Sequence, residues 1–265
     1  MHDLCDDLLA ECEELAELCA TLDAPAWASA TAFYGWTPWD EVAHLLFFDE
    51  AALQSLHEPA AFALHAQALN AAMQAGVQIS ALARERYRHL GAPELLAAWR
   101  ERGRSLAAAL RALDPKARLG WYGPTMSARS FASARLMEVW AHGQDIWDLL
   151  GRRRPATPRL QHIAHIGATT FRWTFVNRGW PVPEPEPGVD LAGPAGQRWI
   201  WGEASPRDFV RGSAEEFCLV VTQRRHVDDT ALECRGEAAR QWMKWAQCFA
   251  GEPADPPPRG SRIGP

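Results

Sequence analysis

The sequence lacks several features that would place it in particular protein classes. No apolar run approaches the roughly 20 residues that a transmembrane helix needs, and the opening residues, MHDLCDD, are acidic where a signal peptide would be cationic. The formal net charge is −6, and the basic run at residues 152–154 is one short loop, which gives no basic surface for a phosphate backbone. We therefore expect a cytoplasmic protein without a membrane or nucleic-acid partner.

The chain also lacks a CxxC pair, which argues against a zinc knuckle or a redox motif. Three of its six cysteines, Cys5, Cys12 and Cys19, recur every seven residues in a segment with helical apolar spacing. Seven residues along one helix correspond to about 10 Å of rise, which is too far for a disulfide bond. We expect these cysteines to be reduced and buried in the core.

The composition, 48% hydrophobic and 23% charged, is that of a globular protein. Thr37 and Pro38 predict a helix start, since threonine caps the first turn and proline fits its first position. The proline-rich stretch at residues 181–188 cannot sustain a helix or a central strand, and we place a domain boundary there. The expected helices before it span residues 3–22, 37–56, 60–90, 92–113, about 127–150 and 157–178.

The residue pattern changes after this stretch. Short strand-like segments alternate with two apolar helical segments, which predicts a small α/β domain at 181–265. The tail from Pro253 is rich in proline and glycine, and we expect it to be loose. The fold class that follows is α+β, with a helical bundle at 1–180 preceding the smaller domain. The expected strands are 189–191, 198–201 and 209–211; residues 232–234 link helices at 213–223 and 236–250.

One predicted helix gathers chemically capable side chains on a single face. At 100° per residue, Arg135, Glu138, His142 and Asp145 fall within an arc of about 80°. Glu138 and His142, four residues apart, can reach one metal ion. Asp40 and His44 have the same spacing on an earlier helix. The spacing by itself also fits an ordinary surface pair, which contributes a few tenths of a kcal/mol.

Two segments resemble the signature stretches of the mycothiol-dependent maleylpyruvate isomerase family: residues 37–45 (TPWDEVAHL) and 135–145 (RLMEVWAHGQD). That family belongs to the DinB-like metal-binding bundles, so the resemblance implies a DinB-like four-helix bundle followed by a small α/β domain that covers the site. It also implies His44, Glu138 and His142 as ligands of one divalent metal ion. Two imidazoles and a carboxylate suit zinc better than calcium or magnesium, and three protein ligands leave a position open.

The resemblance further implies a low-molecular-weight thiol as cofactor, whether mycothiol, ergothioneine or a similar molecule. In the related isomerases the thiolate adds to an activated cis double bond, the adduct rotates, and elimination returns the trans isomer. Other relatives transfer thiols. The expected partners are thus a small thiol and a small electrophile that carries a carboxylate. Both a monomer and a homodimer remain possible.

Further site residues follow from the same resemblance. Residues 220–226 (VVTQRRH) resemble the stretch in which these isomerases carry an arginine for carboxylates, so Arg224 and Arg225 are both candidate catalytic residues. The alternative is an exposed arginine at a helix end. We expect Asp145 to orient His142 or accept a proton, the alternative being a structural ion pair.

Arg135, Trp39 and Trp140 are predicted to contact the cofactor. Arg135 would neutralise a carboxylate, or else form a structural ion pair. The tryptophans would wall a dry pocket, or else pack in the core. For the whole protein, the alternative to an enzyme is a DinB-like protein that binds a metal or a ligand without catalysis, because a fold does not determine a function.

Overall fold

The computed structural model describes residues 1–203 and 207–262, and the chain divides into two compact units, Met1–Leu149 and Leu150–Pro265. In the described part of the chain, no helix is long and apolar enough to cross a membrane.

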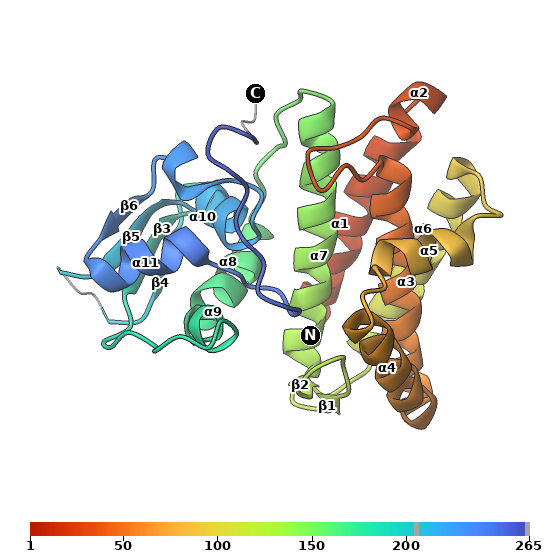
Figure 1. The fold of residues 1–265 in the computed structure, drawn as a ribbon, viewed down its shortest axis with the longest axis horizontal. Coiled ribbons are helices and arrows are strands. Elements are labelled where there is room, and N and C mark those ends of the chain that lie inside the picture. Colours follow the sequence, from red (N-terminus) through yellow and green to blue (C-terminus); the bar gives the residue numbers. More distant parts are fainter. Residues whose placement is uncertain (204–206, 263–265) are drawn as a thin grey trace. The chain divides into compact units, whose positions relative to one another are not determined.

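The first unit is built from helices (Figure 1). Four of them, α1, α3, α6 and α7, pack against one another as a bundle, and its core includes Leu15, Leu45, Leu95 and Leu136, all fully buried. The elements are α1 (His2–Ala20), α2 (Ala24–Trp27), α3 (Pro38–His57), α4 (Pro59–Gln74), α5 (Ile79–Tyr87), α6 (Ala92–Arg111), the hairpin of β1 (Arg118–Leu119) and β2 (Met126–Ser127), and α7 (Ala128–Leu149).

Helix α3 begins where the sequence predicted. The Thr37 hydroxyl accepts a hydrogen bond from the backbone amide of Asp40, and the Asp40 carboxylate accepts one from the amide of Thr37. This reciprocal pair satisfies two amides that lack partners within the helix, and Pro38 needs none. The prediction of one long helix at 60–90 is wrong, because the segment forms two helices, α4 and α5, with a break near Gly76. Gly76 has a φ of 87°, which glycine adopts readily but which ends an α-helix.

The second unit contains a mixed sheet with strand order β4-β3-β5-β6, and helices pack against it. Strand β3 runs antiparallel to β4 and parallel to β5, with Val189 opposite Trp201 on one side and Val210 on the other. The predicted strands are confirmed. The elements are α8 (Leu160–Thr169), α9 (Phe171–Val176), β3 (Gly188–Ala192), β4 (Arg198–Trp201), β5 (Phe209–Ser213), α10 (Ala214–Val221), a 3₁₀ turn (Val227–Asp229), β6 (Glu233–Arg235) and α11 (Glu237–Trp245).

The boundary between the units lies some thirty residues before the expected one at 181, because α8 and α9 pack with the second unit. A Cβ on Gly167 would lie 2.8 Å from Phe217, so glycine allows α8 to approach α10. Phe171 of α9 meets Trp242 of α11 edge to face at 5.2 Å. The expected single helix at 157–178 is accordingly two helices, the first starting at Leu160.

Two further expectations concern cysteines and the tail. All six cysteines are free, and Cys5, Cys12 and Cys19 are buried, as predicted. The tail is not loose through the described residues: the side chain of Gln223 donates to the carbonyl of Ala254. Arg178 pairs with Asp255 at 3.1 Å. Side-chain hydrogen bonds to backbone carbonyls thus hold a segment whose composition favoured disorder.

Candidate metal centre

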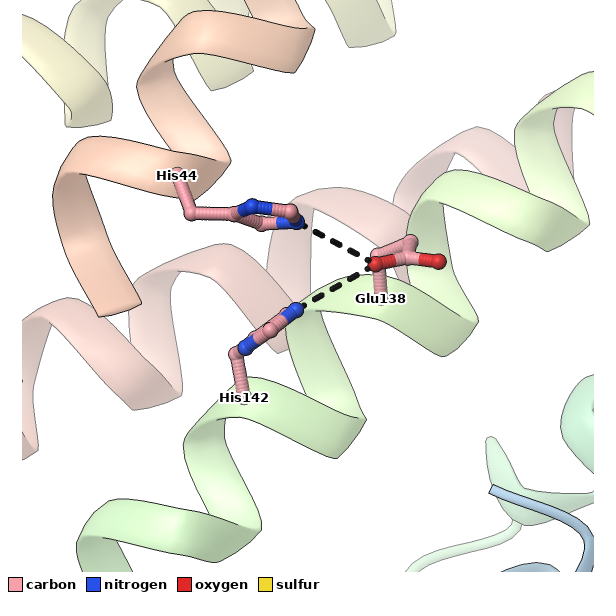
Figure 2. Close-up of side chains that lie close together, drawn as sticks. All are labelled: His44, Glu138 and His142. Carbon is pink, nitrogen blue, oxygen red and sulfur yellow. Dashed lines mark ion pairs between the residues drawn. The ribbon is translucent and has the colours of Figure 1, made fainter. Parts of the chain in front are cut away.

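The three predicted ligands converge in the first unit. His44 comes from α3, and Glu138 and His142 come from successive turns of α7 (Figure 2). Both imidazole Nε2 atoms face the same carboxylate oxygen of Glu138, at 3.6 Å from His44 and 3.3 Å from His142. One donor atom from each residue lies within 4.8 Å of the other two. The shared helix face predicted for Glu138 and His142 is therefore present, and α3 supplies the third donor.

These separations fit a zinc ion. Zinc–nitrogen and zinc–oxygen bonds of about 2.0 to 2.1 Å in a tetrahedron place neighbouring ligand atoms about 3.3 Å apart. The two observed separations lie close to this value. The side chain of Glu138 is 25% exposed and that of His44 is 12% exposed, whereas His142 is buried. Glu138 is therefore the most solvent-accessible of the three ligands.

Glu138 carries the negative charge that a metal ligand needs. Burial raises the pKa of its carboxyl group, but hydrogen bonds and charge from His142 and His44 outweigh burial, and the pKa lies well below its ordinary value. Glu138 is thus a carboxylate at neutral pH, as a metal ligand must be.

A second carboxylate, that of Glu41, contacts the other ring nitrogen of His142; the sequence reasoning missed it. The Nδ1 atom of His142 lies 2.7 Å from Oε2 of Glu41, and Glu41 is fully buried. The other Glu41 oxygen accepts a hydrogen bond of 3.2 Å from the Thr31 hydroxyl. A histidine that binds metal through Nε2 usually donates its Nδ1–H to such a carboxylate. The available signal was the position of Glu41, three residues before His44 and hence one turn away on the same helix.

Asp145 lies close to this pair. One of its oxygens is within 4.8 Å of donor atoms on both Glu41 and His142, and all three side chains are buried. The structure therefore brings Asp145 to the predicted neighbourhood, while the direct contact at 2.7 Å to His142 belongs to Glu41.

Aromatic rings surround the two histidines. Trp36 lies parallel to His142 with ring centroids 5.8 Å apart, and Phe33 meets the same imidazole edge to face at 5.4 Å. Phe48, one turn beyond His44, contacts that histidine at 4.7 Å. These rings fix the orientation of the imidazoles and lower the local dielectric constant, which strengthens electrostatic interactions at the centre.

Two of the residues that were predicted to contact the cofactor interact with other groups of the protein. Arg135 pairs with Asp49, 2.8 Å away, and both side chains are buried. The indole of Trp39 donates to the carbonyl of Leu90 at 3.3 Å. For Arg135 the structure thus supports the ion-pair alternative, and the indole N–H of Trp39 has a backbone partner.

Two more residues differ from their expected surroundings. Trp140 is buried, but it lies two residues from both Glu138 and His142, which is about 200° around α7, so it is on the opposite face of the helix. Asp40 forms an ion pair with Arg84, and its helical spacing to His44 does not add a ligand to the cluster.

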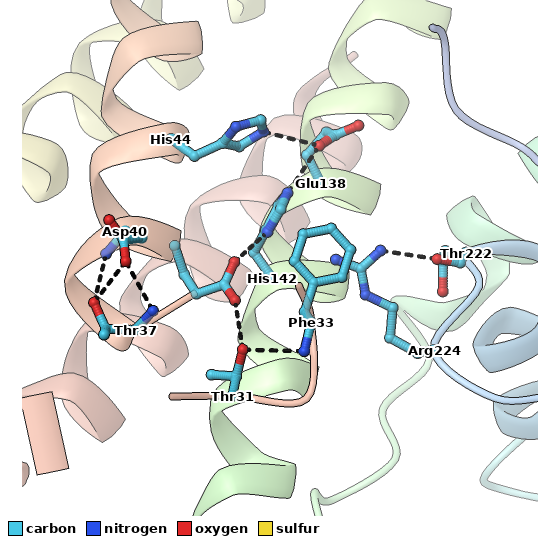
Figure 3. Close-up of polar contacts among 10 residues, drawn as sticks. Thr31, Phe33, Thr37, Asp40, His44, Glu138, His142, Thr222 and Arg224 are labelled. Atoms are coloured by element: carbon cyan, nitrogen blue, oxygen red, sulfur yellow. Dashed lines mark hydrogen bonds and ion pairs between the residues drawn. The ribbon is translucent and has the colours of Figure 1, made fainter. Parts of the chain in front are cut away.

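The two candidate arginines belong to the second unit. Arg224 and Arg225 follow α10 and are 3% and 6% exposed, so the alternative of an exposed helix-end arginine is wrong. Arg224 donates to the carbonyl of Thr222 at 2.8 Å (Figure 3), and Arg225 donates to that of Arg224 at 2.7 Å. The left-handed conformation of Gln223, with φ of 59°, reverses the chain between helix and arginines.

Comparison with known proteins identifies the family. Residues 8–147, just over half of the chain, match the family described as the mycothiol maleylpyruvate isomerase N-terminal domain. The chain belongs to this family. The family match contains all three candidate ligands and ends two residues before the boundary between the units. The resemblance found in the two signature segments is therefore confirmed.

Other comparisons with this mycothiol maleylpyruvate isomerase family member extend over more of the chain. Two uncharacterised proteins from strains of Mycobacterium tuberculosis are each 41% identical over 252 residues, covering 93% of this chain and 95% of theirs. The solved structure of the mycothiol-dependent maleylpyruvate isomerase aligns with a TM-score of 0.53 and 15% identity, over 82% of this chain and 87% of that one. A mutant of it aligns with the same score at 16% identity, over 85% and 90%. The likeness to the solved structures confirms the α+β fold.

Proposed function

We propose that the protein is a metal-dependent enzyme that uses a low-molecular-weight thiol to isomerise, or to transfer the thiol to, a small electrophile that carries a carboxylate. The observation that supports it best is the convergence of His44, Glu138 and His142 on one point. In the residues that the structure describes, this cluster offers three donors, one fewer than a closed tetrahedral site. The family assignment adds the thiol, since the solved relatives are named as mycothiol-dependent.

A divalent ion held by these ligands would favour the thiolate form of a bound thiol near neutral pH. The protein's own contribution is to hold the ligands. Glu41 keeps the Nε2 atom of His142 directed at the centre by accepting from Nδ1. Phe33, Trp36 and Phe48 exclude water from around the imidazoles. Asp145, close to both Glu41 and His142, is the proposed acceptor or donor of a proton.

Carboxylate recognition is proposed for Arg224 or Arg225. Either guanidinium can bind a carboxylate with two parallel hydrogen bonds and keeps its charge at any working pH. Both side chains are buried, where a charge pair interacts more strongly than at the surface. The proposed thiol is mycothiol, for which the solved relatives are named, and ergothioneine is the second candidate.

Metal analysis of purified variants tests the centre. We expect one zinc ion per chain in the wild type and loss of that ion in His44→Ala, Glu138→Ala and His142→Ala. His65→Ala is the matched control, because His65 is half-buried in the same unit but hydrogen-bonds to Gln54 outside the cluster. Undiminished zinc in the three ligand variants would eliminate the proposed centre.

Titration of the zinc-loaded protein with thiols then tests the chemistry. Mycothiol, ergothioneine, glutathione and bacillithiol are compared by calorimetry, and any thiol that binds is tested for isomerisation of maleylpyruvate and for transfer to an electrophile. Binding with turnover supports the enzyme. Zinc without binding of any thiol at millimolar concentration would favour the alternative of a metal- or ligand-binding protein without catalysis.

A further inference from the structure

The three tyrosines of the chain differ in what their hydroxyl groups contact. Tyr34 is 70% exposed, so water surrounds it. Tyr87 is buried and its hydroxyl donates to the carboxylate of Glu50 at 2.8 Å. Tyr122 has neither water nor a partner: its hydroxyl oxygen is buried, and among the described residues it has no hydrogen-bond partner. A buried hydroxyl without a partner destabilises a fold, so a reason for its retention is required.

Aromatic rings surround Tyr122. Its ring lies 5.3 Å from Phe62, 4.9 Å from Trp121 and 5.5 Å from Phe48, always edge to face or steeply tilted. Phenylalanine would satisfy all three contacts equally well. Packing therefore explains the ring of Tyr122 but not its hydroxyl group.

Two residues connect Tyr122 with the metal centre. Phe48 contacts Tyr122 and also contacts His44, one turn earlier on α3, with ring centroids 4.7 Å apart. Arg135, one turn before Glu138 on α7, acts on the hydroxyl: burial raises the pKa of Tyr122, and the charge of Arg135 partly opposes that rise. Tyr122 thus contacts a residue one turn from His44 on α3, and its hydroxyl is influenced by a residue one turn from Glu138 on α7.

We propose that the Tyr122 hydroxyl donates a hydrogen bond to a carboxylate oxygen of the small molecule bound at the metal centre. The proposal rests on the proposed function and adds a ligand-contacting residue to it. Arg135 is already paired with Asp49, so it offers a ligand little free charge, whereas the phenol has a proton to donate. A hydrogen bond from a neutral donor to a carboxylate in surroundings of low dielectric constant is among the strong ones.

Tyr122→Phe removes only the hydroxyl group and provides the test. Zinc-loaded wild type and variant are titrated with ethanethiol, which has no carboxylate, and with mercaptoacetate, 3-mercaptopropionate and 4-mercaptobutyrate, in which the carboxylate lies at increasing distance from sulfur. We expect ethanethiol affinity to be unchanged and the affinity for at least one mercaptocarboxylate to fall about tenfold in the variant, the range of one charge-assisted hydrogen bond. Equal affinities of the two proteins for every probe would overturn the proposal.

The metal-free protein gives a second readout. Because the hydroxyl of Tyr122 has no protein partner, Tyr122→Phe should unfold at the same temperature as the wild type or a higher one. Tyr87→Phe is the matched control: it loses the bond to Glu50, so it should unfold at a lower temperature but bind every probe like the wild type. A clear drop in the unfolding temperature of Tyr122→Phe would show that the hydroxyl serves the fold, and would also overturn the proposal.

The titration separates this proposal from the proposed function. If wild-type protein binds neither ethanethiol nor any mercaptocarboxylate, the thiol-dependent function fails, and the role of Tyr122 fails with it. If the wild type binds them and Tyr122→Phe binds them equally, only the role of Tyr122 is lost.

Discussion

Glu41 and His142 form a buried pair across two helices, with Oε2 of Glu41 2.7 Å from Nδ1 of His142. The contact leaves Nε2 as the atom that faces Glu138 and His44. It also accounts for a fully buried carboxylate on α3, which the Thr31 hydroxyl stabilises at its second oxygen. Glu41 therefore selects the tautomer and the orientation in which His142 can bind a metal ion.

Removal of this support should weaken metal binding without removing a ligand. We expect Glu41→Ala to raise the dissociation constant for zinc about 10- to 100-fold, the usual effect of losing such a partner. Glu41→Gln should have a smaller effect, because an amide oxygen still accepts from Nδ1–H. Competition with a chromophoric chelator measures both constants. A zinc affinity of Glu41→Ala within about twofold of wild type would contradict this role.

The difference between Glu41 and the three ligands shows what could be predicted from the sequence. Glu138 and His142 are recognisable because one helix determines their spacing, and His44 because its segment resembles a family signature. The partner of His142 depends on how α3 meets α7, and the position of Glu41 one turn before His44 does not by itself specify that contact. For the same reason Arg135, which shares a helix face with Glu138, was assigned to the cofactor although it pairs with Asp49 from α3.

The fold shows a similar division. The start of α3, with its N-cap Thr37 and with Pro38 after it, was predicted to the residue, because the capping interactions are local. The break at Gly76 was missed, since a single glycine within an apolar helical pattern is a weak signal. The unit boundary at Leu149 was missed because it depends on the packing of α8 and α9 against α10 and α11.

The ion pair between Arg135 and Asp49 should act on stability and not on metal content. Both side chains are buried, and the indole of Trp99 also donates to Asp49 at 3.0 Å. Asp49→Ala leaves a buried guanidinium without its partner, which costs about 3 to 5 kcal/mol of unfolding free energy. Urea unfolding measures this loss. The double variant Asp49→Leu, Arg135→Met removes both charges and should recover most of it. Equal destabilisation of the single and double variants would argue against a pair that acts as a unit.

The ion pair between Asp40 and Arg84 should make stability depend on pH in the acid range. Burial raises the pKa of Asp40, but hydrogen bonds from Arg84 and Thr37 outweigh burial, so the pKa lies below its ordinary value of 3.8. A carboxyl group whose pKa is lower in the folded state stabilises the fold above the unfolded value, and this stabilisation is lost as pH falls through the folded value.

We therefore expect Asp40→Asn to be less stable than wild type at pH 7 and the difference to shrink below about pH 4. Urea unfolding of both proteins between pH 3 and pH 7 measures the difference. Arg84→Met should behave in the same way, because it returns the pKa of Asp40 toward its unfolded value. A stability difference that stays constant across this range would show that the Asp40 charge contributes nothing.

Zinc binding should stabilise the protein in proportion to its affinity. A ligand that binds only the folded state adds about 2.7 kcal/mol when its free concentration is 100 times its dissociation constant. We expect saturating zinc to raise the unfolding temperature of wild type and a strong chelator to reverse the rise. His142→Ala should show neither effect, while His65→Ala should behave as wild type. A similar rise with zinc in His142→Ala would place the binding elsewhere in the chain.

Removal of the two adjacent arginines should separate substrate binding from metal binding. Arg224 and Arg225 belong to the unit Leu150–Pro265, whereas the ligands belong to Met1–Leu149, so Arg224→Ala and Arg225→Ala should retain one zinc ion per chain. If one of them holds a substrate carboxylate, its removal should lower kcat/KM by an amount equivalent to about 2 to 5 kcal/mol, the cost of breaking a buried charge pair. The other variant should keep its turnover.

Each arginine also donates to a backbone carbonyl, so the unfolding temperature of each variant shows whether the fold is intact. Lysine at the decisive position keeps the charge but loses the two-pronged geometry, and it should restore turnover only in part. Full turnover in both alanine variants would remove the arginines from the proposed mechanism and leave carboxylate recognition to the first unit.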